Sequence, residues 1–172
     1  MKEIIINDNH LLDSDIEKEV VRVKGLIINS HGKILLAHNN NTFQFPGGHL
    51  DEGEDMNECI TREIVEETGI HVILKEEPFL CIKTYDNDYF GTGKKVLNSI
   101  YYYRFFTDEL PNFEETHYDE LELATEFDLF YIPFVDLKNF LQKCIEDEKI
   151  DPNIGREMIH VVEIYNEIYN TK

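Results

Sequence analysis

Residues 48–70 read GHLDEGEDMNECITREIVEETGI, and this stretch contains the strongest local signals in the chain. The residues predict a helix that begins near Asp55, because acidic side chains in a first turn suit the helix dipole. They predict that the helix stops at Thr68, with Gly69 in the left-handed cap position and Ile70 folding back as an apolar residue. The stretch therefore predicts a glycine-containing loop followed by a capped helix.

Three carboxylates share one side of this predicted helix. At about 100° per residue, Glu63, Glu66 and Glu67 fall within about 100° of one another, beside an apolar stripe that includes Ile60 and Ile64. Such neighbours lie about 5–6 Å apart and repel, and turning them toward the core adds a desolvation cost. A hard dication such as Mg²⁺ would offset both costs. The cluster therefore indicates a metal site that could activate water and polarise a phosphoryl oxygen, although a solvated acidic helix face is the competing interpretation.

The same stretch resembles the Nudix signature, which runs glycine, five residues, glutamate, seven residues, then Arg-Glu-aliphatic-any-Glu-Glu-any-Gly-aliphatic. Every specified position is met, by Gly48, Glu54, Arg62, Glu63, Ile64, Glu66, Glu67, Gly69 and Ile70. Ordinary residue frequencies make a chance match on the order of one in a million or rarer. The flanks 32–36, 43–48 and 131–137 extend the resemblance more loosely.

The resemblance implies roles for the matching residues. Glu63, Glu66 and Glu67 would bind Mg²⁺, with Mn²⁺ as a substitute, and Glu66 or Glu67 is also a candidate to take the proton from water. Arg62 would pair with Glu54 and hold the loop onto the helix, because an arginine–carboxylate pair can be bidentate and rigid. Gly48 would let backbone approach the metal or a phosphate, since it has no Cβ.

Outside the signature, a late acidic loop offers a further base. Of its members Glu126 is the preferred catalytic candidate, with Glu122 and Glu120 as alternatives, and each competes with the interpretation of a solvated loop acid. Substrate-binding candidates beyond Gly48 are less specific. They are His49, Phe43 and Arg22, together with the weaker candidates Lys24 and Arg104 for phosphate and Phe45, Tyr85 and Tyr89 for base stacking.

Periodicity predicts an α/β or α+β fold, and the resemblance implies a mixed β-sheet sandwiched between helices. Strands are predicted over 3–7, 20–29, 33–38, 71–84, 95–107 and 130–134, and later helices over 135–148 and 153–170. We expect one domain over 1–172, in which 1–18 form an N-terminal extension and 153–172 a C-terminal helical segment.

The acidic composition disfavours some classes of binding partner. Sixteen Lys and Arg against 35 Asp and Glu give a net charge of −19, which disfavours nucleic acid polymers and anionic membranes. The three cysteines include no Cys-x-x-Cys pair, and no signal peptide or membrane-spanning stretch is recognisable. We therefore expect a cytoplasmic protein that acts on a small nucleotide-type substrate, and a homodimer stays open because many relatives dimerise.

These observations favour a Mg²⁺-dependent hydrolase. Water activated at the glutamate-bound metal would attack one phosphorus of a diphosphate bridge in a nucleoside diphosphate linked to another group. A non-catalytic nucleotide sensor on the same fold is the alternative, and an acidic protein-interaction domain is a third. The sequence does not choose among oxidised nucleoside triphosphates, nucleotide sugars and dinucleoside polyphosphates.

Overall fold

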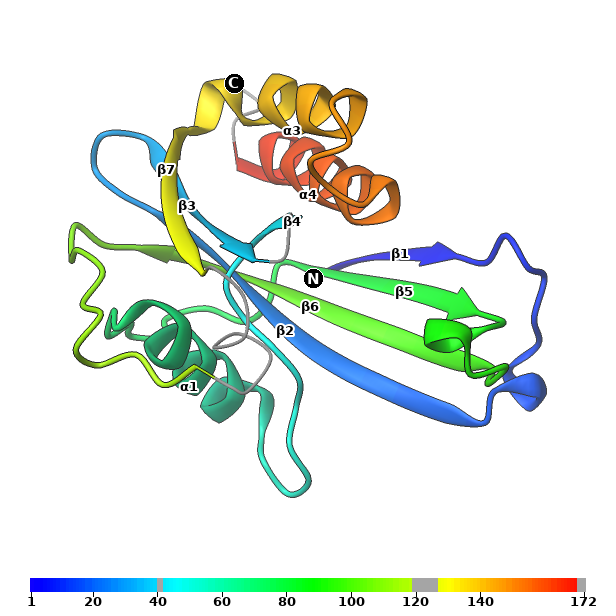
Figure 1. Ribbon diagram of the computed structural model, residues 1–172. Coiled ribbons are helices and arrows are strands. Elements are labelled where there is room, and N and C mark those ends of the chain that lie inside the picture. Colours follow the sequence, from blue (N-terminus) through cyan, green and yellow to red (C-terminus); the bar gives the residue numbers. More distant parts are fainter. Residues whose placement is uncertain (40–41, 119–126, 170–172) are drawn as a thin grey trace.

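One mixed seven-stranded sheet organises the protein (Figure 1). The computed structural model describes residues 1–39, 42–118 and 127–169. The strands run in the order β1-β5-β6-β2-β3-β4, and β7 pairs with β3. Their bounds are β1 Lys2–Ile6, β2 Lys18–Ile28, β3 Lys33–Asn39, β4 Thr42–Gln44, β5 Leu80–Asp86, β6 Val96–Phe106 and β7 Asp128–Pro133.

Helices cover both faces of this sheet (Figure 1). Helix α1 (Met56–Thr68) lies on one face, and α3 (Leu137–Glu146) and α4 (Pro152–Tyr169) lie on the other. Three short 3-10 turns complete the described part, η1 (Asp13–Asp15), η2 (Tyr89–Gly91) and η3 (Phe134–Asp136). This arrangement confirms the predicted mixed sheet between helices.

Alternation along the central strands produces two separate cores. On β2, Leu26 and Ile28 point toward α3 and α4, whereas Val23 and Ile27 point toward α1. This is the two-residue period of a strand that is buried on both faces. Gly25 lies on the α1 face, where a Cβ would come within 2.9 Å of Ile64 Cδ1. The absence of a side chain there lets α1 pack close to β2.

The sheet divides beside β2, and this division creates the space for the site. Strand β2 pairs with β3 only at Ile28↔Ile34, and β4 then takes the same edge of β3 at 37–39. The released edge of β2 bonds instead to the segment after β4. Gly25 N donates to Pro46 O, Val23 N donates to Gly48 O, and Leu50 N donates to Val21 O. The glycine loop is therefore held against β2 by backbone hydrogen bonds.

Most predicted elements are confirmed, with one clear error. Residues 71–84 were predicted as one strand, but β5 begins only at Leu80 and 71–79 have no regular structure. Pro78 lacks a backbone donor and restricts the residue before it. Val72 and Leu74 still pack against the α1 core, so their alternation reflects burial without strand pairing.

The first residues also contribute more than an extension. β1 pairs in parallel with β5 from Lys2↔Leu80 to Ile6↔Thr84 and so adds an edge to the sheet. Within 1–39, 42–118 and 127–169, no helix has the length and apolar character needed to cross a bilayer.

Candidate active site

Helix α1 is fixed at both ends by its own sequence. Asp55 caps its start, where Oδ1 accepts hydrogen bonds from Asn57 N (2.8 Å) and Glu58 N (2.9 Å). Glu58 Oε2 accepts from Asp55 N at 3.3 Å and completes a capping box. The helix ends at Gly69, whose φ of 66° is the left-handed cap conformation. These caps fix the axial position of the glutamates along the helix.

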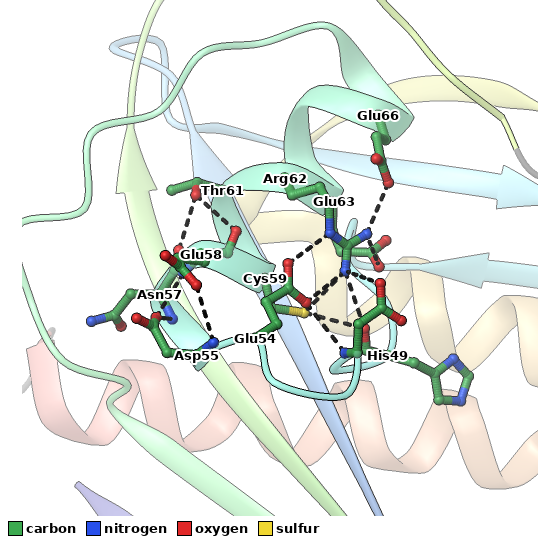
Figure 2. A network of polar contacts seen from close by, with 11 residues as sticks. His49, Glu54, Asp55, Asn57, Glu58, Cys59, Thr61, Arg62, Glu63 and Glu66 are labelled. Carbon is green, nitrogen blue, oxygen red and sulfur yellow. Dashed lines mark hydrogen bonds and ion pairs between the residues drawn. The ribbon is translucent and has the colours of Figure 1, made fainter.

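Arg62 organises the carboxylates around this helix (Figure 2). Its Nε and Nη2 donate to the two oxygens of Glu54 at 2.7 and 2.9 Å, so that pair is bidentate. Its Nη1 donates to Glu63 Oε1 and to Glu66 Oε2, both at 2.9 Å. The guanidinium lowers the pKa of Glu54 to about 2, and Glu54 together with Glu63 raises the pKa of Arg62. Arg62 thus links the loop carboxylate to two of the predicted metal ligands.

The glycine loop approaches the other side of the glutamates. Gly47 N donates to Glu67 Oε2 at 3.0 Å, and the Glu67 side chain is buried with 4% of its surface exposed. A Cβ at Gly48 would collide with the carboxylate of Glu63. The backbone at Gly47 has a φ of 132°, a conformation that favours glycine. Both glycines therefore bring main chain within contact distance of the helix carboxylates.

Cations from β2 form the opposite wall. Lys24 is buried and donates from Nζ to Gln44 Oε1 (2.9 Å) and Phe45 O (3.2 Å). Burial lowers its pKa, while Glu67 opposes that shift. Arg22 Nε donates to His49 Nε2 at 2.9 Å. Burial, followed by the charge of Arg22, lowers the pKa of His49.

These walls enclose a polar cavity of about 440 Å³. Its lining combines cationic, carboxylate, amide and glycine groups, namely Arg22, Lys24, Asn39, Gln44, Gly47, Gly48, His49, Asp51, Arg62, Glu63, Glu66, Glu67 and His117. The division of the sheet beside β2 is what lets side chains of β2 and of α1 face the same space. Cations and carboxylates that meet in this way can contact both a phosphate and its counter-ion.

The donor set suits a hard dication, although the side chains are turned toward Arg62. Within the described residues, no three His, Cys, Asp or Glu side chains are arranged so that they could hold a metal ion. Arg62 instead binds one oxygen of Glu63 and one of Glu66. The carboxylates are nevertheless all-oxygen donors of the kind that Mg²⁺ prefers, and the missing Cβ of Gly48 lets the Glu63 carboxylate lie directly against the loop backbone. The chemistry of the donor set therefore fits such an ion, which would have to compete with Arg62 for Glu63 and Glu66.

Several predicted site residues do not reach this cavity. Phe43 does not line it, because its ring packs among His38, Phe130 and Phe140. Phe45 is a core residue with 1% of its surface exposed. The predicted late-loop candidates Glu120, Glu122 and Glu126 lie outside the described residues.

Two other candidates are engaged elsewhere on the sheet. Arg104 pairs with Glu76 at 2.6 and 2.7 Å, and its guanidinium lies over the ring of Tyr169. The Tyr85 hydroxyl donates to Asp13 at 2.6 Å. Neither residue lines the cavity that contains the glutamates.

Several lining residues, Asp51 among them, were not anticipated from the sequence. Gln44 and Asn39 come from β4 and β3, beside the division in the sheet, and His117 comes from the acidic segment after β6. The N–H of His117 donates to Glu66 O at 2.9 Å, which docks this segment onto α1. Gln44 lies within the 43–48 flank of the signature, so its sequence position could have indicated a place near the glycine loop. Nothing local singles out Asn39 or His117.

Comparison with known proteins adds an independent result. The model of the NUDIX domain matches residues 18–153. "Nucleoside diphosphate-linked moiety X motif 6" of Xenopus laevis is 37% identical over 82 residues, which cover 45% of this chain and 37% of that protein. The "NAD-capped RNA hydrolase NudC" of Vibrio parahaemolyticus is 41% identical over 49 residues, covering 26% of this chain and 19% of that protein. The matches thus span about a third and a fifth of these relatives.

The fold itself is similar to solved structures. The MutT protein from Methanosarcina mazei Go1 superposes with a TM-score of 0.59, covering 88% of this chain and 98% of that one. Sequence identity in this comparison is 19%, so the similarity concerns the fold alone.

Proposed function

Because the chain belongs to the Nudix hydrolase family, we propose that it hydrolyses a diphosphate bond in a small nucleoside diphosphate linked to another group. One observation carries the proposal, namely that the helix glutamates and the cations of β2 line the same cavity. A diphosphate needs both kinds of group, because its oxygens are anionic and the developing charge must be neutralised in the transition state. The cavity of about 440 Å³ is of the size that takes small molecules.

In this proposal Glu63, Glu66 and Glu67 hold Mg²⁺, with Mn²⁺ as a substitute. When bound, the ion would lower the pKa of a coordinated water and neutralise phosphate charge. Arg62 keeps Glu63 and Glu66 on one side of α1 through its Nη1 and anchors Glu54 through Nε and Nη2. Its role is positional, since its donors are engaged by the carboxylates and by the carbonyl of His49.

On the opposite wall, Arg22, Lys24 and His49 are the groups that would bind phosphate oxygens. Lys24 is held by Gln44 Oε1 and Phe45 O, so its ammonium is oriented before a substrate arrives. Arg22 is oriented by His49 and by the Tyr89 hydroxyl. Orientation before binding reduces the entropy that binding costs. Glu66, Glu67 and Glu126 are the candidates to accept the proton of the attacking water.

A substrate panel tests this function. Purified protein is incubated with Mg²⁺ or Mn²⁺ and nucleoside triphosphates, nucleotide sugars, ADP-ribose, dinucleoside polyphosphates, NAD and NAD-capped RNA, and phosphate release is measured with and without added phosphatase. We expect hydrolysis of at least one diphosphate-linked compound, and its loss in EDTA. No hydrolysis across the panel, combined with nucleotide binding, would favour the non-catalytic sensor.

Glu67→Gln is the matched variant for this assay. Glutamine keeps the shape of the side chain and one oxygen acceptor for Gly47 N, while it removes the charge that the metal needs. We expect kcat to fall by roughly 10²- to 10⁴-fold while the circular dichroism spectrum is retained. Near-normal turnover in a folded Glu67→Gln protein would exclude this role for Glu67.

A further inference from the structure

The turn between β5 and β6 carries an exposed aromatic side chain on strained backbone. Phe90 lies in η2 with φ 50° and ψ 36°, the left-handed region that non-glycine residues seldom adopt, and 79% of its surface is exposed. Neither feature helps the fold, because strain costs free energy and the ring is left in water. Strained positions of this kind concentrate at ligand-binding sites.

Phe90 is coupled to the candidate active site through Tyr89. The two rings lie 4.4 Å apart between centroids at an interplanar angle of 63°. The Tyr89 hydroxyl accepts a hydrogen bond from Arg22 Nη2 at 3.2 Å, and Arg22 lines the cavity and donates to His49. The aromatic pair is therefore fixed next to a cation that faces the proposed phosphate position.

The cavity has no comparable surface of its own. Among the described residues that line it there is no Phe or Tyr, and its groups are mainly charged or amide side chains and glycines. Phe43 and Phe45 are occupied in the core, as described above. The rings among the described lining residues are the imidazoles of His49 and His117, so a nucleobase attached to a phosphate in this cavity would otherwise meet mainly charged and amide groups. Its flat faces are best matched by an aromatic ring.

We propose that Phe90, backed by Tyr89, is the stacking surface for the nucleobase of the substrate. The inference rests on the proposed function, since it assumes a nucleoside diphosphate-linked ligand. Arg22 binds a phosphate oxygen, the ribose spans the edge of the cavity, and the base lies against Phe90. Because every base has a π-face, such a surface selects nucleotides over base-free phosphates while it discriminates little among bases.

Direct binding of two probes tests the proposal without turnover. Adenosine monophosphate and ribose 5-phosphate share the sugar phosphate and differ in the base. Their affinities for the full chain are measured by NMR titration in EDTA. The variants are Phe90→Gly, which suits the positive φ and so preserves the turn, and Phe90→Tyr, which keeps an aromatic ring.

We expect Phe90→Gly to weaken adenosine monophosphate binding by roughly 5- to 150-fold and to leave ribose 5-phosphate binding unchanged. Phe90→Tyr should bind both probes as the parent protein does. Unchanged nucleotide affinity in Phe90→Gly overturns the proposal, as does an equal loss for both probes, which would mean that Phe90 acts only by positioning Arg22. A parent protein that binds both probes equally also overturns it.

The substrate panel separates this proposal from the proposed function. Base-dependent binding that requires Phe90, without hydrolysis of any compound, would uphold the stacking surface and reject the hydrolase. Hydrolysis with the same KM for the parent protein and Phe90→Gly would uphold the hydrolase and reject the stacking surface.

Discussion

At position 62 a single guanidinium donates hydrogen bonds to three carboxylates, from Glu54, Glu63 and Glu66, and a fourth, from Asp51, lies 3.7 Å away. Arginine can do this because its five donors form a planar fork, whereas lysine offers one compact ammonium. Three nearby negative charges would otherwise repel, and the Arg62 side chain is only 30% exposed. The residue thus keeps the acidic face of α1 compatible with a folded state in the absence of a cation.

Two adjacent glycines should respond differently to a methyl group. At Gly47 a Cβ would collide with the backbone of Val23, and the φ of 132° would be strained. At Gly48 the collision is with the carboxylate of Glu63, a side-chain group that can change its rotamer. We expect Gly47→Ala to lower the free energy of unfolding by about 2 kcal/mol or more. Gly48→Ala should change it by less than about 1 kcal/mol yet reduce metal-dependent kcat at least tenfold.

Urea unfolding and the substrate panel measure the two effects side by side. A Gly48→Ala protein with full turnover would show that Glu63 does not need its present position against the loop.

Glu157 on α4 makes a pH-dependent contribution to the stability of the fold. Burial raises its pKa, and a hydrogen bond from the Tyr102 hydroxyl and the charges of Lys24 and Arg22 oppose this only in part. A folded pKa above the unfolded value means that the neutral acid is favoured in the native state. The stabilisation is complete below the unfolded pKa and is lost as pH rises through the folded pKa. Glu157→Gln should therefore gain stability relative to the parent protein between pH 4 and pH 7.

The measurement is urea unfolding of both proteins in EDTA across that range. Glu163→Gln on the same helix is the control, because the pKa of Glu163 is lowered by Lys138 and its contribution must change in the opposite direction. A pH-independent difference for Glu157→Gln would reject the raised pKa.

At the level of elements, α1 depends on its first turn. Asp55 satisfies two backbone donors, and the glutamates follow at fixed offsets from it. Asp55→Ala should lower the free energy of unfolding by about 1 kcal/mol. We also expect a weaker apparent affinity for Mg²⁺, since fraying of this turn loosens the attachment of the loop. Chemical denaturation and metal titration test both points.

Glu52→Ala is the matched control for the cap, because Glu52 is an exposed acid in the same loop. Equal losses in the two variants would attribute the effect to loop charge rather than to capping.

Strand β2 is the second decisive element. It pairs with β6 along its whole length, from Lys18↔Val96 to Ile28↔Phe106, but with β3 at a single position. The part of β2 before Ile28 is therefore paired with β6 on one edge and hydrogen-bonded to the glycine loop on the other. Arg22 and Lys24 belong to the part of β2 that does not pair with β3, and both side chains line the cavity.

On the scale of the whole molecule, a net charge of −19 opposes the approach of an anionic substrate. The cations of β2 offset this repulsion only inside the cavity. Burial lowers the pKa of Lys24, because it disfavours the charged form of the side chain. A bound dication would remove two charges where the phosphate must enter. On the proposed function, we therefore expect metal binding to strengthen substrate binding.

Metal binding should raise the free energy of unfolding of the protein. Mg²⁺ at ten times its Kd should stabilise the native state by about 1.4 kcal/mol, which raises Tm by about 3–6 °C for a domain of this size. The increase should be lost in Glu67→Gln and retained in Glu163→Gln, with NaCl of matched ionic strength as the reference. An equal increase in all three proteins would indicate general screening of the acidic surface.

The local part of this picture could be predicted from the sequence. The bounds of α1, its Asp55 cap and the Gly69 terminus follow from residues close to one another in the chain, whereas the pairing of Arg62 with Glu54 was implied by the family resemblance. Short-range sterics and hydrogen bonding decide such features, so a local pattern predicts them. The strand predicted over 71–84 was wrong in its first part, because burial gave residues 71–79 a strand-like alternation without a pairing partner.

The sequence by itself determined the acidic helix, its caps and the glycine loop before it. Only the tertiary structure decided that Arg22, Lys24 and His49 line one cavity with the glutamates of that helix, that Phe43 and Arg104 are engaged elsewhere, and that Tyr89 contacts both Arg22 and Phe90. These relations depend on the pairing of β2 with β6 and on its separation from β3. Such pairings join residues far apart in the chain, and their free energy comes from burial across the whole sheet.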